Sequence, residues 1–234
     1  MLLYVIRHGD PIYETDTLTE RGNMQAEALG LRLQRSKIDR IFSSPMGRAR
    51  ETAAPACRLL GLECEIEEWA HEIEDERKTI YKTDVPRSIS WYSSAEFRAH
   101  GDLCLDYDHA FDAKVIESTQ MRRKVAEIER AGDIFLEKLG YKREGENYRI
   151  LFPNEQKVAL VCHTCLSRAW LSTLLHIPLH IVWAGFQMTH TGVTIFDFPN
   201  DASGVTAPRC LCYSDMSHLY AEHLDLRHDN KKEL

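Results

Sequence analysis

The chain has 234 residues, of which 44% are hydrophobic and 28% charged, and its formal net charge is -7. This composition is typical of a globular domain, and the acidic balance argues against a nucleic-acid partner, whose phosphates require a basic surface. No apolar run approaches the roughly 20 residues that span a bilayer, and residues 1–6 are too short for a secretory signal. We therefore expect a cytoplasmic protein without a membrane partner, with its seven cysteines in the reduced state.

Strands and helices alternate through the first third of the chain. Apolar spacing predicts a strand at residues 2–6, a helix at 19–35, a strand at 38–42, a helix at 46–60 and a short strand at 62–66. Thr19 suits the N-cap of the first helix, and Gly61 suits the position just after the second. This order is the one expected of an open α/β sheet.

The rest of the chain contains one irregular stretch. Periodicity is lost over residues 67–118, and we interpret 75–118 as an inserted cap segment that covers the substrate. Beyond it, the pattern predicts a helix at 119–139, strands at 148–152 and 158–161, a helix at 165–175, and strands at 192–198 and 209–213. The sequence therefore predicts a single α/β domain over residues 1–234, a three-layer α/β/α sandwich with a mostly parallel central sheet.

Aromatic side chains gather in the insertion, and two interpretations of them stay open. Aromatic rings bury large apolar areas, so they suit both a substrate wall and a small core of their own. The residues concerned are Trp91, Tyr92, Phe97, Tyr107 and Phe111.

Chemically active side chains stand where the predicted strands end. Arg7 and His8 follow the first strand, Arg48 lies just beyond the second, and His163 follows the strand at 158–161. Because ligands of open α/β sheets bind at the carboxyl ends of the strands, we expect these side chains to converge. Arginines offset phosphoryl charge and a histidine can attack phosphorus. With a carboxylic acid from the group Glu72, Glu74 and Asp75, the set would form a metal-free phosphoryl-transfer site.

The order and spacing of the motifs resemble the histidine phosphatase superfamily, which has the phosphoglycerate-mutase-like fold. The matching segments are Arg7-His8-Gly9, residues 18–22 (LTERG), 43–45 (SSP) leading to 48–53 (RARETA), 161–163 (VCH) and 190–194 (HTGVT). They extend over nearly the whole chain and leave only 75–118 outside the match. The residue after the second histidine, commonly glycine in the family, is Thr164.

The resemblance implies a role for each member of the predicted site. His8 would be the phosphorylated nucleophile, Arg7, Arg48 and His163 would bind the phosphoryl group, and Glu72 would be the proton donor. Glu72 is preferred to Glu74 by the alignment of the apolar positions before it. The implied activity is hydrolysis of a small phosphorylated metabolite through a phosphohistidine, with His8, Glu72 and His163 as catalytic residues and without a metal or other cofactor.

Two alternatives share this fold. Phosphoglycerate-type mutases carry a long Ser/Trp/Asn-containing signature after the Arg-His-Gly, whereas this chain continues with residues 10–13 (DPIY). This difference favours a phosphatase. The other alternative is a catalytically weak module that binds phosphorylated ligands. Such a module would differ from a phosphatase in the acidic loop near residue 72, where the proton donor would be missing.

The segment around the second histidine also permits thiol chemistry. Cys162 and Arg168 have the spacing of cysteine-dependent phosphatases, and Cys162 with Cys165 forms a C-x-x-C pair. A zinc site would need a second pair, for which Cys210 and Cys212 are poorly spaced. The loop after Cys162 lacks the glycines that let backbone amides surround a phosphate, so we favour histidine chemistry.

Overall fold

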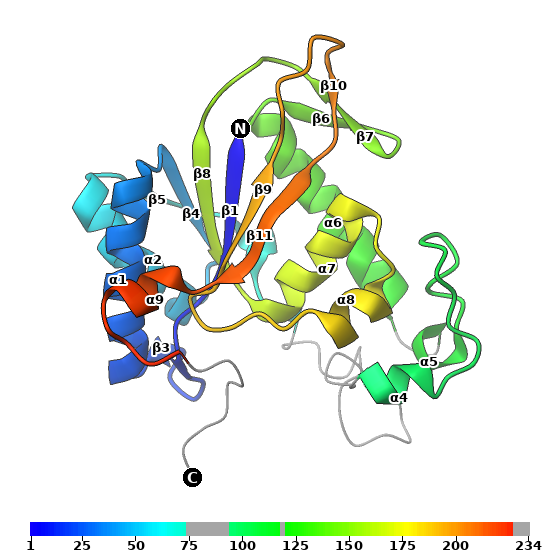
Figure 1. The fold of residues 1–234 in the computed structure, drawn as a ribbon, viewed down its shortest axis with the longest axis horizontal. Coiled ribbons are helices and arrows are strands. Elements are labelled where there is room, and N and C mark those ends of the chain that lie inside the picture. The colour runs from blue at the N-terminus through cyan, green and yellow to red at the C-terminus, as the bar shows by residue number, and fades with distance from the viewer. Residues whose placement is uncertain (74–93, 118–119, 227–234) are drawn as a thin grey trace.

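A six-stranded central sheet organises the computed structural model, which describes residues 1–73, 94–117 and 120–226 (Figure 1). Its strand order is β11-β9-β1-β8-β4-β5. The strands are β1 (Leu2–Arg7), β4 (Arg40–Ser43), β5 (Cys64–Ile66), β8 (Lys157–Cys162), β9 (Val193–Asp197) and β11 (Arg209–Asp215). Neighbours among β1, β8, β4 and β5 pair in parallel, whereas β9 is antiparallel to both β1 and β11. The predicted mostly parallel sheet is confirmed.

Helices cover both faces of this sheet (Figure 1). On one side lie α1 (Glu20–Ser36) and α2 (Gly47–Leu60), and on the other lie α6 (Met121–Lys138), α7 (Thr164–Leu175) and α8 (Leu179–Gly185). Alternate strand residues supply the two layers: Leu3 and Val5 belong to one apolar cluster, and Tyr4 and Ile6 to the other. This period-two alternation with both faces buried is the reason that β1 reads as a continuous apolar run. The predicted α/β/α sandwich is confirmed.

The predicted helices are present with small shifts of their ends. They are α1 (Glu20–Ser36), α2 (Gly47–Leu60), α6 (Met121–Lys138) and α7 (Thr164–Leu175). The Thr19 side chain accepts a hydrogen bond from the Gly22 amide at 2.9 Å, and Gly61 ends α2 in the left-handed conformation with φ 67°. Both caps therefore act as their residue types predict.

Several elements differ from the prediction. The segment at 148–152 is β7 (Asn147–Ile150), which joins β6 (Tyr141–Glu144) and β10 (Val205–Thr206) in a separate three-stranded sheet. The sequence pattern did not predict α8 (Leu179–Gly185), α9 (Ser217–Ala221) or the paired strands β2 (Pro11–Ile12) and β3 (Thr17–Leu18). These elements are too short for their apolar spacing to be distinguished from chance, so tertiary contacts define them.

The described part of the insertion packs beside α8. It contains α4 (Ser94–Arg98) and α5 (Lys114–Glu117), and the Phe97 ring lies 6.2 Å from the ring of His180 in α8. Phe97 and Phe111 are buried in the larger apolar cluster, so for these two the core interpretation holds. Trp91, Tyr92 and the rest of 75–93 lie outside the described residues. That the insertion covers the substrate stays a prediction.

Helices α6 and α7, which lie on the same face of the sheet, approach each other closely at one point. Gly132 of α6 faces the indole of Trp170 in α7, and a Cβ atom on Gly132 would overlap the indole nitrogen. Trp170 is fully buried and packs on Trp69 and Phe135.

Within residues 1–73, 94–117 and 120–226, no helix combines the length and apolarity needed to cross a membrane.

Gly132→Ala is expected to reduce the free energy of unfolding by about 1–3 kcal/mol, because the new methyl group overpacks against Trp170. Gly185→Ala is the matched helical control, since a Cβ there meets no atom within 4 Å. We expect this control to be neutral or more stable by up to about 1 kcal/mol. Urea unfolding of the three proteins measures the difference, and equal stability of Gly132→Ala and wild type would contradict the assigned helix contact.

Candidate active site

The pairing of β1 with β8 brings two histidines together at the carboxyl edge of the sheet. Arg7 is opposite Cys162 in the parallel register, so the next residues, His8 and His163, lie side by side with ring centroids 5.1 Å apart. Arg48, in the first turn of α2, reaches the same point. The structure therefore brings together the predicted residues from three separate strand ends, and the side chains of the five predicted site residues are buried: Arg7, His8, Arg48, Glu72 and His163.

The His8 ring is held as one tautomer. Its Nδ1 lies 2.7 Å from the carbonyl oxygen of Gly9, which can only accept, so Nδ1 carries the proton. Nε2 is then unprotonated, and the Arg48 Nε donates to it at 3.3 Å. Burial, followed by the proximity of His163 and the charges of Arg7 and Arg48, lowers the pKa of His8 well below its ordinary value. His8 thus presents a neutral, nucleophilic Nε2.

His163 begins α7 and is likewise neutral. Its Nε2 lies 2.8 Å from the hydroxyl of Ser44, at the end of β4, whereas Nδ1 is buried without a hydrogen-bond partner among the described residues. Burial, together with the charges of Arg48 and Arg7, lowers the pKa of His163 well below its ordinary value. The unpartnered nitrogen is a polar atom that a bound phosphoryl oxygen would satisfy.

Hydrogen bonds hold both arginines of the site. The Arg7 Nη1 donates to the carbonyl oxygen of Met188 at 2.7 Å, while its buried Nε has no partner in the described part of the chain. The Arg48 Nη1 pairs with Asp16 at 2.5 Å, and Asp16 also accepts from the Gly47 amide. The Arg48 Nε donates to His8, and its Nη2 lies 3.5 Å from the Met46 sulfur. The Arg7 guanidinium, which is held on one side and open at Nε, is suited to binding a tetrahedral anion.

Glu72 lies at the N-terminus of α7. Its carboxylate accepts hydrogen bonds from the amides of Leu166 at 3.0 Å, Cys165 at 3.2 Å and Ile73 at 2.9 Å. An acidic side chain in this position is favoured by the helix dipole and by the unpaired amides of the first turn. The contacts place Glu72 next to His163, which is the N-cap residue of the same helix. Glu74, the other acid considered, lies outside the described residues.

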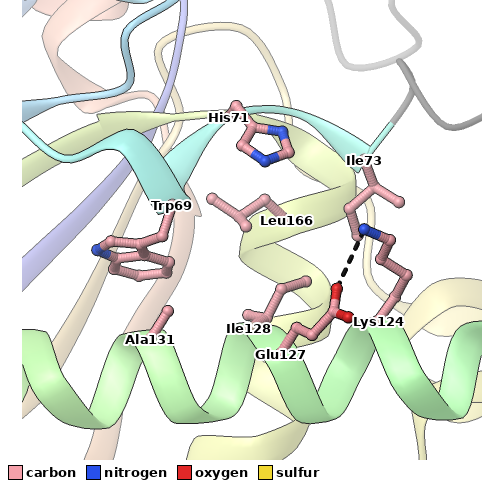
Figure 2. A pocket seen from close by; sticks show the side chains of 8 residues that line it. All are labelled: Trp69, His71, Ile73, Lys124, Glu127, Ile128, Ala131 and Leu166. Atoms are coloured by element: carbon pink, nitrogen blue, oxygen red, sulfur yellow. Dashed lines mark ion pairs between the residues drawn. The ribbon is translucent and has the colours of Figure 1, made fainter.

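A small cavity flanks the segment that carries Glu72. Its volume is about 190 Å³, and Figure 2 shows Trp69, His71 and Ile73 on one side and residues of α6 on the other. The Lys124 ammonium pairs with Glu127 at its edge at 3.1 Å. This volume is below the roughly 300 Å³ of typical ligand pockets, so the cavity by itself assigns no ligand. His71 lies near enough to His163 for its charge to contribute to the lowered pKa of that ring.

The thiols do not form a second nucleophilic centre. Cys162 belongs to the larger apolar cluster, and burial raises the pKa of its thiol to about 12. Arg168 donates to the Trp183 carbonyl oxygen at 2.9 Å, and its Nη2 is 3.9 Å from the Cys165 sulfur. A cysteine phosphatase needs an accessible thiolate and an arginine free to bind phosphate. Cys162 and Arg168 have the sequence spacing of such an enzyme but not this arrangement. In the described ranges, no group of three or more His, Cys, Asp or Glu side chains is placed to hold a metal.

The remaining motif residues position the loop after His8. The Gly9 amide donates to the Thr52 hydroxyl at 2.9 Å, and the Leu18 amide donates to the Glu51 carboxylate at 2.7 Å. Gly22 lies so close to the Asp10 backbone that a Cβ atom would overlap it. These contacts join the segments 18–22 and 48–53 to the loop that follows Arg7-His8-Gly9.

One residue near His8 had no role in the prediction. The ring of His190 lies 5.7 Å from that of His8, and its Nδ1 is 3.5 Å from the Asp10 carboxylate. Burial lowers the pKa of His190 to about 2. His190 opens the segment 190–194 that contributed to the family resemblance, but the pattern gave no sign that its side chain would lie beside His8.

Comparisons with known proteins agree with this geometry. The sequence model of the histidine phosphatase superfamily, branch 1, matches residues 3–80. A curated relative from Hydrogenobacter thermophilus, named "Putative phosphoserine phosphatase 2", is 24% identical over 225 residues, which are 91% of this chain and 97% of the relative.

Solved structures with a similar fold include two proteins named as phosphatases. Phosphoserine phosphatase from Entamoeba histolytica, in complex with 3-phosphoglyceric acid, has a TM-score of 0.60 and 19% identity over 93% of this chain and 98% of that one. Mycobacterial glucosyl-3-phosphoglycerate phosphatase has a TM-score of 0.58 and 19% identity over 91% and 98% of the two chains. At this identity the structures show a shared fold. The family match over residues 3–80 covers the segment that carries Arg7, His8 and Arg48.

Proposed function

We propose that the protein hydrolyses the phosphomonoester of a small metabolite through a phosphohistidine on His8. The observation that carries this proposal is the state of His8, whose Nδ1 proton is held by Gly9 while Nε2 faces the Arg48 guanidinium. A neutral imidazole with its lone pair beside two buried arginines is arranged to attack a phosphoryl group. The relatives named as phosphoserine and glucosyl-3-phosphoglycerate phosphatases support the same substrate class.

The proposed reaction has two steps. His8 Nε2 forms a bond to phosphorus as the bond from phosphorus to the ester oxygen breaks, and protonated Glu72 gives its proton to the departing alcohol. Water then attacks phosphorus, Glu72 takes back a proton, and the bond from phosphorus to Nε2 breaks, which restores His8. Arg7, Arg48 and His163 bind the phosphoryl oxygens in both steps.

The charges of the site support a metal-independent reaction, and the state of the cysteines supports a location in the cytoplasm. Two guanidinium groups within the buried site supply the positive charge that divalent cations supply in many other phosphoryl-transfer enzymes. The thiols also fit a reducing compartment, because the described cysteines are all free and Cys162 and Cys165 are buried beside His163.

Replacing His8 with alanine is expected to reduce turnover of p-nitrophenyl phosphate by at least about 10³-fold, because the nucleophile is lost. The assay contains excess EDTA and compares wild type, His8→Ala and Cys162→Ser. Wild type and Cys162→Ser should both remain active, and wild type quenched during turnover should carry phosphate on His8. Activity that is lost in Cys162→Ser and kept in His8→Ala would instead identify a thiolate enzyme.

Glu72→Gln is expected to affect poor leaving groups most, because only an alkoxide needs a proton as it departs. Release of the alcohol in the first turnover should fall by about 10²–10⁴-fold for an alkyl phosphate. For p-nitrophenyl phosphate, whose phenolate leaves without a proton, the first-turnover loss should be less than about tenfold. Rapid-quench measurements on both substrates provide the comparison. Equal losses would assign Glu72 to helix anchoring alone, a role that the melting temperature reports separately.

The neutral state of His8 predicts a pH dependence of stability. The folded pKa of His8 lies well below its ordinary value, so the unfolded chain binds more protons below about pH 6.5. Stability conferred by the neutral ring is therefore present above that pH and is lost as the pH falls. Urea unfolding at pH 7.5 and 5.5 should show a smaller loss for His8→Asn than for wild type, by up to about 1.4 kcal/mol per pH unit. Parallel pH profiles would show that His8 is protonated in the folded protein.

A further inference from the structure

His190 is a largely buried histidine beside His8, and the proposed reaction has no use for it. Its side chain is 12% exposed, its ring lies 5.7 Å from that of His8, and its Nε2 is buried without a hydrogen-bond partner among the described residues. Buried polar atoms are nearly always satisfied by a partner, so an unsatisfied one next to a reaction centre points to a ligand atom.

The backbone that carries His190 is strained and firmly held. Thr191 adopts φ 53°, which is costly for a β-branched residue. Its amide donates to the carbonyl oxygens of Arg7 at 3.1 Å and His8 at 3.3 Å, and its hydroxyl lies 3.1 Å from Nε2 of His218 in α9. The turn is therefore tied directly to the end of β1, and it keeps the His190 ring at a defined place against His8.

Asp10 determines which nitrogen of His190 carries the proton. The Asp10 carboxylate lies 3.5 Å from Nδ1 and is itself held by the Thr19 hydroxyl at 2.8 Å, while the Asp10 amide donates to Gln25. A carboxylate favours the proton on the nearer ring nitrogen, so Nε2 of His190 has the lone pair. The Asp10–His190 pair thus presents a hydrogen-bond acceptor.

The acceptor on His190 differs in kind from the arginines proposed to bind the phosphoryl group. The guanidinium groups of Arg7 and Arg48 can only donate, and they bind oxygen atoms that carry no proton. Nε2 of His190 requires a donor instead, and the donor that accompanies a phosphomonoester or its hydrolysis is a hydroxyl group. We propose that Nε2 of His190 accepts a hydrogen bond from a hydroxyl group next to the phosphoryl group on His8. This inference rests on the proposed function and adds a residue to it.

The hydroxyl group has two possible sources, which are the attacking water and the alcohol part of the substrate. In either case His190 orients the hydroxyl and does not take its proton, since burial and the charges of Arg7 and Arg21 lower its pKa to about 2. The proton of the water goes to Glu72, as in the proposed reaction.

Two variants separate the acceptor from the contact with Asp10. His190→Asn retains a polar atom near Nδ1 for Asp10 but removes the acceptor at Nε2. His190→Gln is long enough to return a carbonyl oxygen to the position of Nε2. His180→Asn is the control, because His180 is also buried but lies in α8 and packs on Phe97. Melting temperatures of all three variants report any effect on folding.

The decay of ³²P-labelled phospho-His8 and steady-state kinetics distinguish the two sources. If His190 holds the water, His190→Asn should slow phosphoenzyme decay about tenfold for every substrate, including p-nitrophenyl phosphate, which has no hydroxyl group. If it holds the substrate, KM for glycerol phosphate should rise about tenfold while phosphoenzyme decay and KM for p-nitrophenyl phosphate stay unchanged. In both cases His190→Gln should recover part of the loss, and His180→Asn should match wild type.

Unchanged decay and unchanged KM in His190→Asn would overturn the inference, as would a His190→Gln variant no better than His190→Asn. These results are separate from a failure of the proposed function, which would appear as wild-type protein that forms no phosphohistidine.

Discussion

The parallel pairing of β1 with β8 is the constraint on which the rest of the site depends. The register that places Arg7 opposite Cys162 is also the one that places His8 beside His163. A slip by one residue would move every side chain of β1 to the other face of the sheet and would bury Leu3 and Val5 in the wrong layer. The apolar core that stabilises the fold and the pair of histidines that perform the proposed chemistry are therefore specified by the same backbone hydrogen bonds.

The carboxyl edge of the sheet has buried positive charge and unpartnered nitrogen atoms that a bound anion would satisfy. Arg7 and Arg48 are buried together with neutral histidines, and in the described part of the chain buried nitrogens of Arg7, His163 and His190 have no partner. Burying charge and polar atoms in this way costs stability, which the surrounding α/β scaffold must offset. A phosphoryl group would bring both negative charge and hydrogen-bond acceptors. The same arrangement keeps His8 unprotonated, so ligand binding and nucleophilicity have a common electrostatic cause.

Glu72 connects the chemistry to the scaffold. Its carboxylate accepts hydrogen bonds from the first-turn amides of α7, whose N-cap is His163, so the proposed proton donor also holds the helix next to the proposed phosphate-binding histidine. The strained turn at Thr191 has a comparable effect on the other side of His8, because it hydrogen-bonds to the end of β1. His8 and Glu72 are thus both held by backbone contacts, which would keep the geometry of the site through the two steps of the proposed reaction.

The sequence by itself determined the sandwich, its main strands and helices, and the convergence of Arg7, His8, Arg48 and His163, because apolar periodicity and strand ends are local properties. It could not predict that β7 would leave the central sheet or that α8 would form, since such short elements depend on distant partners. Only the tertiary structure decided that Cys162 lies in the apolar core, that Asp16 pairs with Arg48, and that His190 lies against His8. These outcomes arise from contacts between residues far apart in the chain, and no spacing within one segment encodes them.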